Sequence, residues 1–301
     1  MAAAAVSSSS GSELPPLRWL TALEIIKRLR SVQFLTLRMP GYMRLDNGSV
    51  MSLARLSQLR KVELAATIDV KQLCVLLEAT PHLHTLELTH LVTSHPEGDS
   101  YADSSTQSRF SGSDLGQARF RLNSLSLAHT ELDDRSLFLL LSSTKETLRS
   151  LRFSSFSGTT RAGFKLALQL AGPTLRRLAL QNVSFQALPT DATPAMSNLI
   201  DDLPRVCPLL EELQVSTSKI CSDQNFLTTV LPSLFLTHLE LNYAATLVSE
   251  GQILSMISNF PAGRMEVLCL GPHFAHLSTS KVQRACQEIG IVLLASSGSA
   301  D

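Results

Sequence analysis

The sequence predicts an α/β solenoid shaped like a horseshoe, with a parallel sheet on its concave side and helices outside. Two observations predict it: a short apolar phrase, L-x-x-L-x-L, returns about nine times, and several copies are followed by a stretch of helical periodicity. The phrase is clearest at 81–88 (PHLHTLEL) and recurs at 173–180 (PTLRRLAL) and 208–215 (PLLEELQV). A repeat of this kind establishes the architecture before any single residue is considered.

The spacing of the phrase is close to regular along the chain. Its middle apolar residue falls at positions 35, 62, 86, 125, 151, 178, 213, 239 and 268, so the steps are 27, 24, 39, 26, 27, 35, 26 and 29. Most steps lie at the upper end of the range for leucine-rich repeats, roughly 20–29 residues. The two long steps indicate insertions, and residues 291–294 are expected to form a closing strand.

Each repeat is predicted to be a strand followed by a helix. The L-x-L part alternates with period 2, as a short strand does, whereas apolar residues at helical spacing follow, as in Ile253, Met256, Ile257 and Phe260. Helix starts are indicated by Asp69, Thr160 and the Ser249/Gln252 capping-box pattern. Strands reached through crossover helices lie parallel, and no single repeat can bury its apolar residues alone, so neighbouring repeats must stack into one core.

Composition limits the classes of function. The chain has 301 residues, is 44% apolar, and balances 26 Lys plus Arg against 26 Asp plus Glu, which argues against a dedicated nucleic-acid-binding protein. Five cysteines without a C-x-x-C pair indicate reduced thiols in a cytoplasmic or nuclear protein. No convincing signal peptide and no apolar run of membrane-spanning length are present, so no membrane association is expected.

The predicted organisation is one repeat domain with loose flanks. Residues 14–295 form the domain of about nine repeats, and the Ser-, Gly- and Asp-rich stretch 92–118 is a flexible insertion. Residues 1–13 are expected to be disordered and residues 296–301 to form a loose tail.

The concave face is the predicted partner-binding surface, because the outward positions of each strand are mostly small and polar. The candidate binding residues on and beside this face are Arg149, Arg152, Arg176, Arg177, Lys61, Glu63, Glu87 and Glu240. The four arginines come from adjacent repeats and could form a basic patch for an acidic or phosphorylated partner, since guanidinium pairs bidentately with both groups. The alternative is solvated charge, partly neutralised by Glu211 and Glu212.

No catalytic, metal or cofactor site is predicted. His90 and His129 occupy equivalent positions with His84 nearby, but no cluster of three or four ligands accompanies them. Glu63 and Glu87 lie on an open face with no nucleophile and nothing to exclude water. The sequence also lacks a glycine-rich phosphate loop and a G-x-S-x-G motif, so the chain is not expected to be an enzyme.

The repeat spacing, the segment 207–213 (CPLLEEL) and the ending 285–291 (ACQEIGI) resemble the leucine-rich repeat region of fungal F-box proteins. That region is similar in fold to ribonuclease inhibitor. In such proteins an N-terminal F-box docks on the adaptor of a cullin-based ubiquitin ligase, and the repeats hold the substrate. The resemblance therefore implies a substrate-recognition module.

Two features depart from the family pattern. Residues 13–16 (ELPP) resemble the opening of an F-box, but the first repeat begins near Val32, so an intact F-box is not expected. The turn after each strand lacks the usual Asn or Cys, which predicts an irregular solenoid. A GTPase regulator of the leucine-rich repeat GTPase-activating type is the alternative function.

Overall fold

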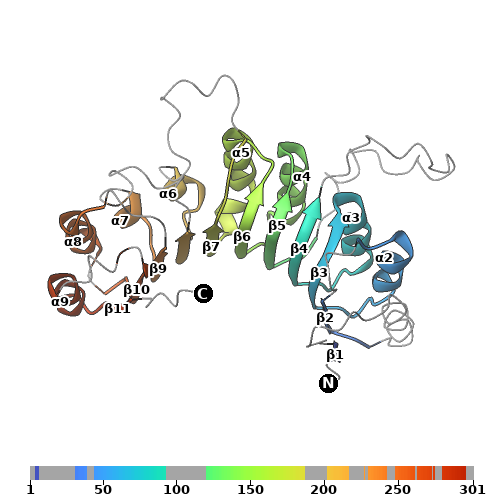
Figure 1. The fold of residues 1–301 in the computed structure, drawn as a ribbon, viewed down its shortest axis with the longest axis horizontal. Helices are drawn as coiled ribbons and strands as arrows, with labels where there is room; N and C mark the ends of the chain where they lie inside the picture. The colour runs from blue at the N-terminus through green and yellow to red at the C-terminus, as the bar shows by residue number, and fades with distance from the viewer. Residues whose placement is uncertain are drawn as a thin grey trace.

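The fold is the predicted solenoid, with strands on the inner side of an arch and helices on the outer side (Figure 1). The computed structural model describes residues 4–6, 31–38, 44–92, 120–186, 202–216, 227, 230–242, 248–261, 263–272, 274 and 280–295. Within them one sheet of eleven strands runs β1 to β11 in chain order, and every neighbouring pair is parallel. The α/β leucine-rich repeat architecture is therefore confirmed.

The strands coincide with the apolar phrases. They are β1 (Ala4–Val6), β2 (Phe34–Arg38), β3 (Lys61–Asp69), β4 (Thr85–Val92), β5 (Ser124–Glu131), β6 (Ser150–Ser157), β7 (Arg177–Gln181), β8 (Glu212–Ser216), β9 (His238–Leu241), β10 (Val267–Leu270) and β11 (Val292–Ala295). The last of these is the predicted closing strand, and the period-2 alternation is visible in burial, since Leu86 and Leu88 are buried while the residues between and beside them are not.

The helices lie between successive strands and cover the outer face of the sheet (Figure 1). They are α2 (Asn47–Ala54), α3 (Val70–Ala79), α4 (Asp134–Thr144), α5 (Arg161–Ala171), η2 (Gly172–Thr174), α6 (Leu203–Val206), α7 (Leu231–Ser233), α8 (Glu250–Asn259) and α9 (Ser280–Glu288). Apolar stripes turn inward, as in α8, where Ile253, Met256 and Ile257 are buried.

The predicted helix starts are confirmed in atomic detail. Asp69 accepts a hydrogen bond from the amide of Gln72 at 2.8 Å, and the Gln72 side chain accepts from the amide of Asp69. Ser249 and Gln252 form the same reciprocal pair, and Thr160 accepts from the amide of Gly163 at 3.0 Å. Each pair satisfies amides that the first helical turn leaves without a partner.

The strands are held in register by one carbonyl ladder at the point where each strand begins. The carbonyl of Arg60 accepts amides from His84 and Thr85, and the carbonyl of Arg149 accepts amides from Arg176 and Arg177. The same two-amide pattern joins eight successive pairs of strands, from β2–β3 to β9–β10. As a result the middle apolar residues lie side by side, in the order Leu35, Val62, Leu86, Leu125, Leu151, Leu178, Leu213, Leu239, Leu268 and Leu293.

In the four repeats of β4 to β7, the turn position that usually carries Asn or Cys is instead part of the core. Leu91, Phe156 and Val183 are buried there, and Thr130 is buried with its hydroxyl donating to the carbonyl of Ala128. Phe156 packs against Phe153 at 4.6 Å between ring centroids and against Phe164 of α5 at 5.9 Å. Apolar packing thus replaces the absent asparagine ladder.

Strand β3 contains one residue more than its neighbour β4. The register shifts between Ala65 and Ile68, so that Ile68 rather than Thr67 lies beside Leu91. Counting along the phrase places Thr67 at this position, and the bulge corrects the assignment. The shift brings a fully buried isoleucine to the core in place of a threonine.

A column of left-handed residues follows four consecutive strand cores. His90, His129, Ser155 and Asn182 have φ angles of 68°, 47°, 51° and 49°, and each lies four residues after the middle apolar position of its strand. Asn and His are enriched in this conformation because short or polar side chains tolerate it. The left-handed residues therefore lie at the same level in these four repeats, and β4, β5 and β6 each continue for two residues beyond them.

The chain's start differs from the expectation of disorder for residues 1–13. Ala4–Val6 form β1, which pairs with β2 through Ala4↔Leu35 and Val6↔Leu37 and adds a strand to the first repeat. The other residues of that segment lie outside the described residues. So do residues 14–30, nearly all of the expected insertion 92–118, and the expected tail 296–301.

We expect Gly172→Ala to destabilise the protein by about 1–3 kcal/mol, the usual cost of overpacking. A Cβ on Gly172 would lie 2.2 Å from the carbonyl oxygen of Val206, a backbone atom of the next repeat. Gly251→Ala is the matched control, because its nearest neighbour would be 3.9 Å away and alanine favours the helix. Urea unfolding of both variants measures the difference, and equal stabilities would contradict this account of the contact.

Candidate functional site

The concave face presents one row of side chains per outward strand position. The first row runs Phe34, Lys61, Thr85, Ser124, Ser150, Arg177, Glu212, His238, Val267 and Val292. The second row runs Thr36, Glu63, Glu87, Ser126, Arg152, Ala179, Gln214, Glu240, Cys269 and Leu294. Parallel pairing in strict register makes both rows continuous, so side chains from distant parts of the chain form one surface.

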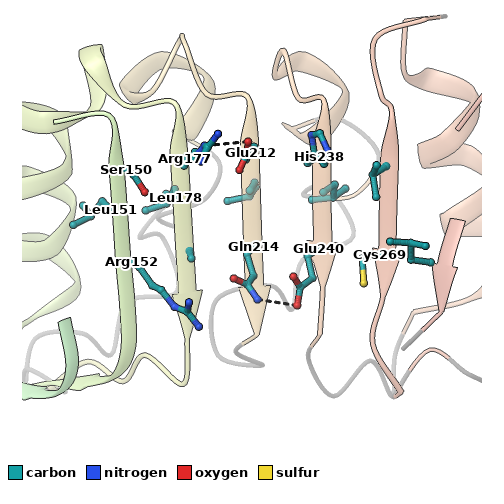
Figure 2. A pocket seen from close by; sticks show the side chains of 15 residues that line it. Ser150, Leu151, Arg152, Arg177, Leu178, Glu212, Gln214, His238, Glu240 and Cys269 are labelled. Carbon is teal, nitrogen blue, oxygen red and sulfur yellow. Dashed lines mark hydrogen bonds and ion pairs between the residues drawn. The ribbon is translucent and has the colours of Figure 1, made fainter. Parts of the chain in front are cut away.

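A hollow of about 440 Å³ lies on this face over β6 to β11. Figure 2 shows two levels of polar side chains within it, with Arg177, Glu212 and His238 at one level and Arg152, Gln214 and Glu240 at the other. The hollow contains three of the predicted binding residues, namely Arg152, Arg177 and Glu240. It is therefore a part of the concave face that could receive a partner.

The four predicted arginines do not form a single free patch. Arg177 pairs with Glu212 at 3.0 Å, and Arg176 pairs with Glu211 on the same neighbouring repeat. Arg152 donates to the side chain of Gln181 at 3.0 Å. Arg149 donates to the carbonyl of Thr174 at 3.0 Å. In the sixth repeat, the charges of Arg176 and Arg177 are therefore partly neutralised by Glu211 and Glu212, as in the alternative interpretation.

A second predicted group, Lys61, Glu63 and Glu87, forms a compact charge cluster on β3 and β4. The Nζ atom of Lys61 lies 2.7 Å from Glu63 and 3.1 Å from Glu87, and Thr36 donates to Glu63 at 3.2 Å. The hydrogen bond to Glu63, followed by that to Glu87, raises the pKa of Lys61, and the Lys61 hydrogen bond lowers the pKa of Glu63. The lowered pKa of Glu63 does not favour acid–base catalysis, which works best with a pKa near the operating pH.

The last predicted residue, Glu240, accepts a hydrogen bond from Gln214 at 2.8 Å (Figure 2). Beyond it the surface becomes apolar, which the phrase analysis did not single out. Val292 and Leu294 of β11 are 56% and 50% exposed, and they pair in register with Val267 and Cys269 of β10. The available signal was the uninterrupted apolar run at 291–294 (IVLL). A strand that is apolar at every position must expose the apolar residues of one face.

His90 and His129, which occupy equivalent positions on β4 and β5, lie side by side. Their rings stack with centroids 5.2 Å apart and planes 16° from parallel. Burial, together with the proximity of His129, lowers the pKa of His90. Protonation of His90 therefore costs more in the folded chain than in the unfolded chain.

The His90 environment predicts a pH dependence of stability. Because the folded pKa lies below its ordinary value of 6.5, the unfolded state binds the proton more tightly. The contribution is present above pH 6.5 and is lost as pH falls through the folded pKa. We expect His90→Asn, which keeps a residue tolerant of positive φ but cannot titrate, to reduce this fall. Urea unfolding between pH 5 and 8 tests it, and identical profiles for both proteins would contradict it.

The described residues contain no group of three or more His, Cys, Asp or Glu side chains that could hold a metal ion. Burial raises the pKa of the Cys74 and Cys207 thiols to about 12, with Glu78 and Asp69 adding to the effect on Cys74. A thiol with so high a pKa is a poor nucleophile at neutral pH.

We expect Cys74 and Cys207 to resist alkylation at pH 8, because each is buried and protonated. Cys269, which lies half-buried on the concave face, serves as the internal comparison. Peptide mass spectrometry after iodoacetamide treatment should find Cys269 modified first and the other two only after denaturation. Rapid modification of Cys74 in the native protein would show that its helix opens readily.

Within the described parts of the chain, no helix has the length and apolar character needed to cross a membrane.

Comparisons with known proteins identify no family for this chain. No protein-family model matches the sequence, and no curated protein matches it either. Among solved structures, the crystal structure of the Rad7 and Elc1 complex in yeast matches over 90% of this chain and 77% of that chain. The identity is 13% and the TM-score is 0.43, a level at which likeness assigns no function.

Proposed function

We propose that this chain is a non-catalytic protein-interaction scaffold that binds its partner on the concave face. The supporting observation is the continuous, open surface of side chains over the ten parallel strands β2 to β11, with its hollow over β6 to β11. Backbone groups of the strands are used by the ladder, so the outward side chains can vary and bind without cost to the fold. A solenoid of this kind offers an extended concave binding surface.

The composition of the hollow suits a polypeptide ligand. Charged and amide groups such as Arg152, Gln214 and Glu240 line it over β6 to β9, and the apolar side chains Val267 and Leu294 line its end over β10 and β11. Interfaces between proteins combine apolar anchors with a polar surround in this way. The surface is open to solvent, and for that reason suits binding better than chemistry that requires exclusion of water.

The specific role we propose is substrate recognition in a ubiquitin ligase of the F-box type. Its support is the resemblance of the repeat phrases to the leucine-rich repeat region of fungal F-box proteins. The odd number of cysteines, of which the described Cys74, Cys207, Cys269 and Cys286 are free, agrees with a cytoplasmic or nuclear location.

Affinity capture with a charge-swapped concave face tests the proposal. In Arg152→Glu/Glu240→Arg, net charge is unchanged but two side chains of the hollow exchange sign. We expect partners recovered with the native chain to be depleted about tenfold or more, since charge mismatches at an interface cost several kcal/mol. Quantitative mass spectrometry of the recovered proteins measures the depletion.

The matched control is Arg161→Glu/Glu288→Arg, the same exchange on the outer helices α5 and α9. Its recovered partners should equal those of the native chain. If both variants lose their partners equally, or neither does, the concave face is not the binding surface. Recovery of a cullin complex with its adaptor supports the ligase role, whereas partners without it leave the scaffold role alone.

A further inference from the structure

The edge of the solenoid where the strands begin carries an excess of positive charge. The described turns that lead into β3 to β8 contain the cations Arg55, Arg60, Arg121, Lys145, Arg149 and Arg176, all exposed. The same turns contain only two carboxylates, Glu146 and Glu211. The edge where the strands begin is therefore positively charged over β3 to β8.

We define the basic rim as Arg60, His84, Arg121, Arg149 and Arg176, one residue for each of β3 to β7. The carbonyl ladder passes through Arg60, His84, Asn123, Arg149 and Arg176, and Arg121 lies two residues before Asn123. His84 contacts the carbonyl of Arg121 at 3.3 Å, which links the second and third steps. Strands lie ~4.8 Å apart, so the basic rim extends about 19 Å in single file.

Two of the turns that carry the basic rim are fixed by half-buried threonine hydroxyls. Thr147 donates to the carbonyl of Leu122 at 2.9 Å, and Thr174 donates to the carbonyl of Leu148 at 2.7 Å. Each threonine lies two residues before an arginine of the rim, Arg149 or Arg176. The backbone at these steps is thus ordered before any ligand binds, which lowers the entropy lost on binding.

The floor beside the basic rim is made of hydroxyl groups. Between Lys61 and Arg177, the first concave row consists of Thr85, Ser124 and Ser150, all half-buried. Hydroxyls donate hydrogen bonds to carboxylate oxygens, and arginine binds carboxylates through two parallel bonds. Arg149 uses one donor on the carbonyl of Thr174, so further donors of its guanidinium can face a ligand. Arg176 is paired with Glu211 through one nitrogen, and the other donors of its guanidinium are left for a ligand carboxylate.

We propose that the basic rim from β3 to β7 binds an extended, Asp/Glu-rich segment of a partner polypeptide. This inference rests on the proposed function, because it names the chemical class of the partner. A single file of separated charges matches a run of several carboxylates better than one phosphate, which needs guanidiniums converging on one point. Stacking with single-stranded nucleic acid needs aromatic side chains, and the described turns that lead into β3 to β8 contain no exposed Phe, Tyr or Trp.

An extended chain rises about 3.3 Å per residue, so about six residues cover the basic rim. The probe is therefore a fluorescein-labelled eight-residue peptide of mixed Asp and Glu, with binding to the full chain measured by fluorescence anisotropy. The comparison peptides are its Asn/Gln counterpart, a neutral peptide with one phosphoserine, and an eight-nucleotide single strand. We expect the acidic peptide to bind most tightly and to weaken as salt rises.

The variant Arg60→Glu/Arg121→Glu/Arg149→Glu should bind the acidic peptide about tenfold or more weakly, since like charges then face it. Arg161→Glu/Arg205→Glu/Arg284→Glu makes the same change in net charge on α5, α6 and α9, and should bind within about twofold of the native chain. Thermal unfolding establishes that both variants are folded. If the first is not, Arg121→Glu against Arg205→Glu gives the same comparison.

The inference is overturned if the native chain does not bind the acidic peptide, if both triple variants bind it equally, or if the phosphoserine peptide or the oligonucleotide binds more tightly. Failure of the proposed function would give a different result. If the concave face does not bind the partner, Arg152→Glu/Glu240→Arg leaves partner capture intact, whether or not the acidic peptide binds.

Discussion

The carbonyl ladder at the strand starts is the interaction on which the rest of this structure depends. One carbonyl in each repeat, such as that of Arg60 or Arg149, accepts two amides from the next repeat and so fixes where the next strand begins. Once the start is fixed, alternation along each strand determines which side chains face the helices. This produces the buried row from Leu35 to Leu268, in which each residue lies beside the equivalent residue of the next repeat.

The sequence predicted the parts of the fold that depend on apolar periodicity and helix capping. Asp69, Thr160 and Ser249 were assigned as helix starts because their side chains satisfy amides locally, and local interactions are readable from spacing. The bulge in β3 was not predicted, since it depends on Ile68 finding a place beside Leu91 of another repeat. Pairing of Ala4–Val6 with β2 was missed for a related reason, because an Ala-rich strand has no pattern of its own.

The candidate site shows the same division. Counting along the phrase placed Arg152, Arg177 and Glu240 on the concave face, where they line the hollow. Each of them pairs with a residue of an adjacent strand. The partners are Gln181 for Arg152, Glu212 for Arg177 and Gln214 for Glu240. Which of several nearby groups pairs with an arginine depends on side-chain reach and rotamer, and spacing alone does not contain these. The stacking of His90 on His129 was likewise hidden until their left-handed backbone was known.

The joints between repeats are nearly identical, although the intervening segments differ in length. Strands β4 and β5 are separated by the longest step, yet Leu86 and Leu125 pair in the same register as Leu125 and Leu151, which are separated by an ordinary one. The different lengths of the connecting segments therefore do not change the register of the sheet. Such a chain can diverge along two separate routes, by lengthening its outer connections or by exchanging outward residues such as Ser124 and Ser126, while the inner frame stays constant.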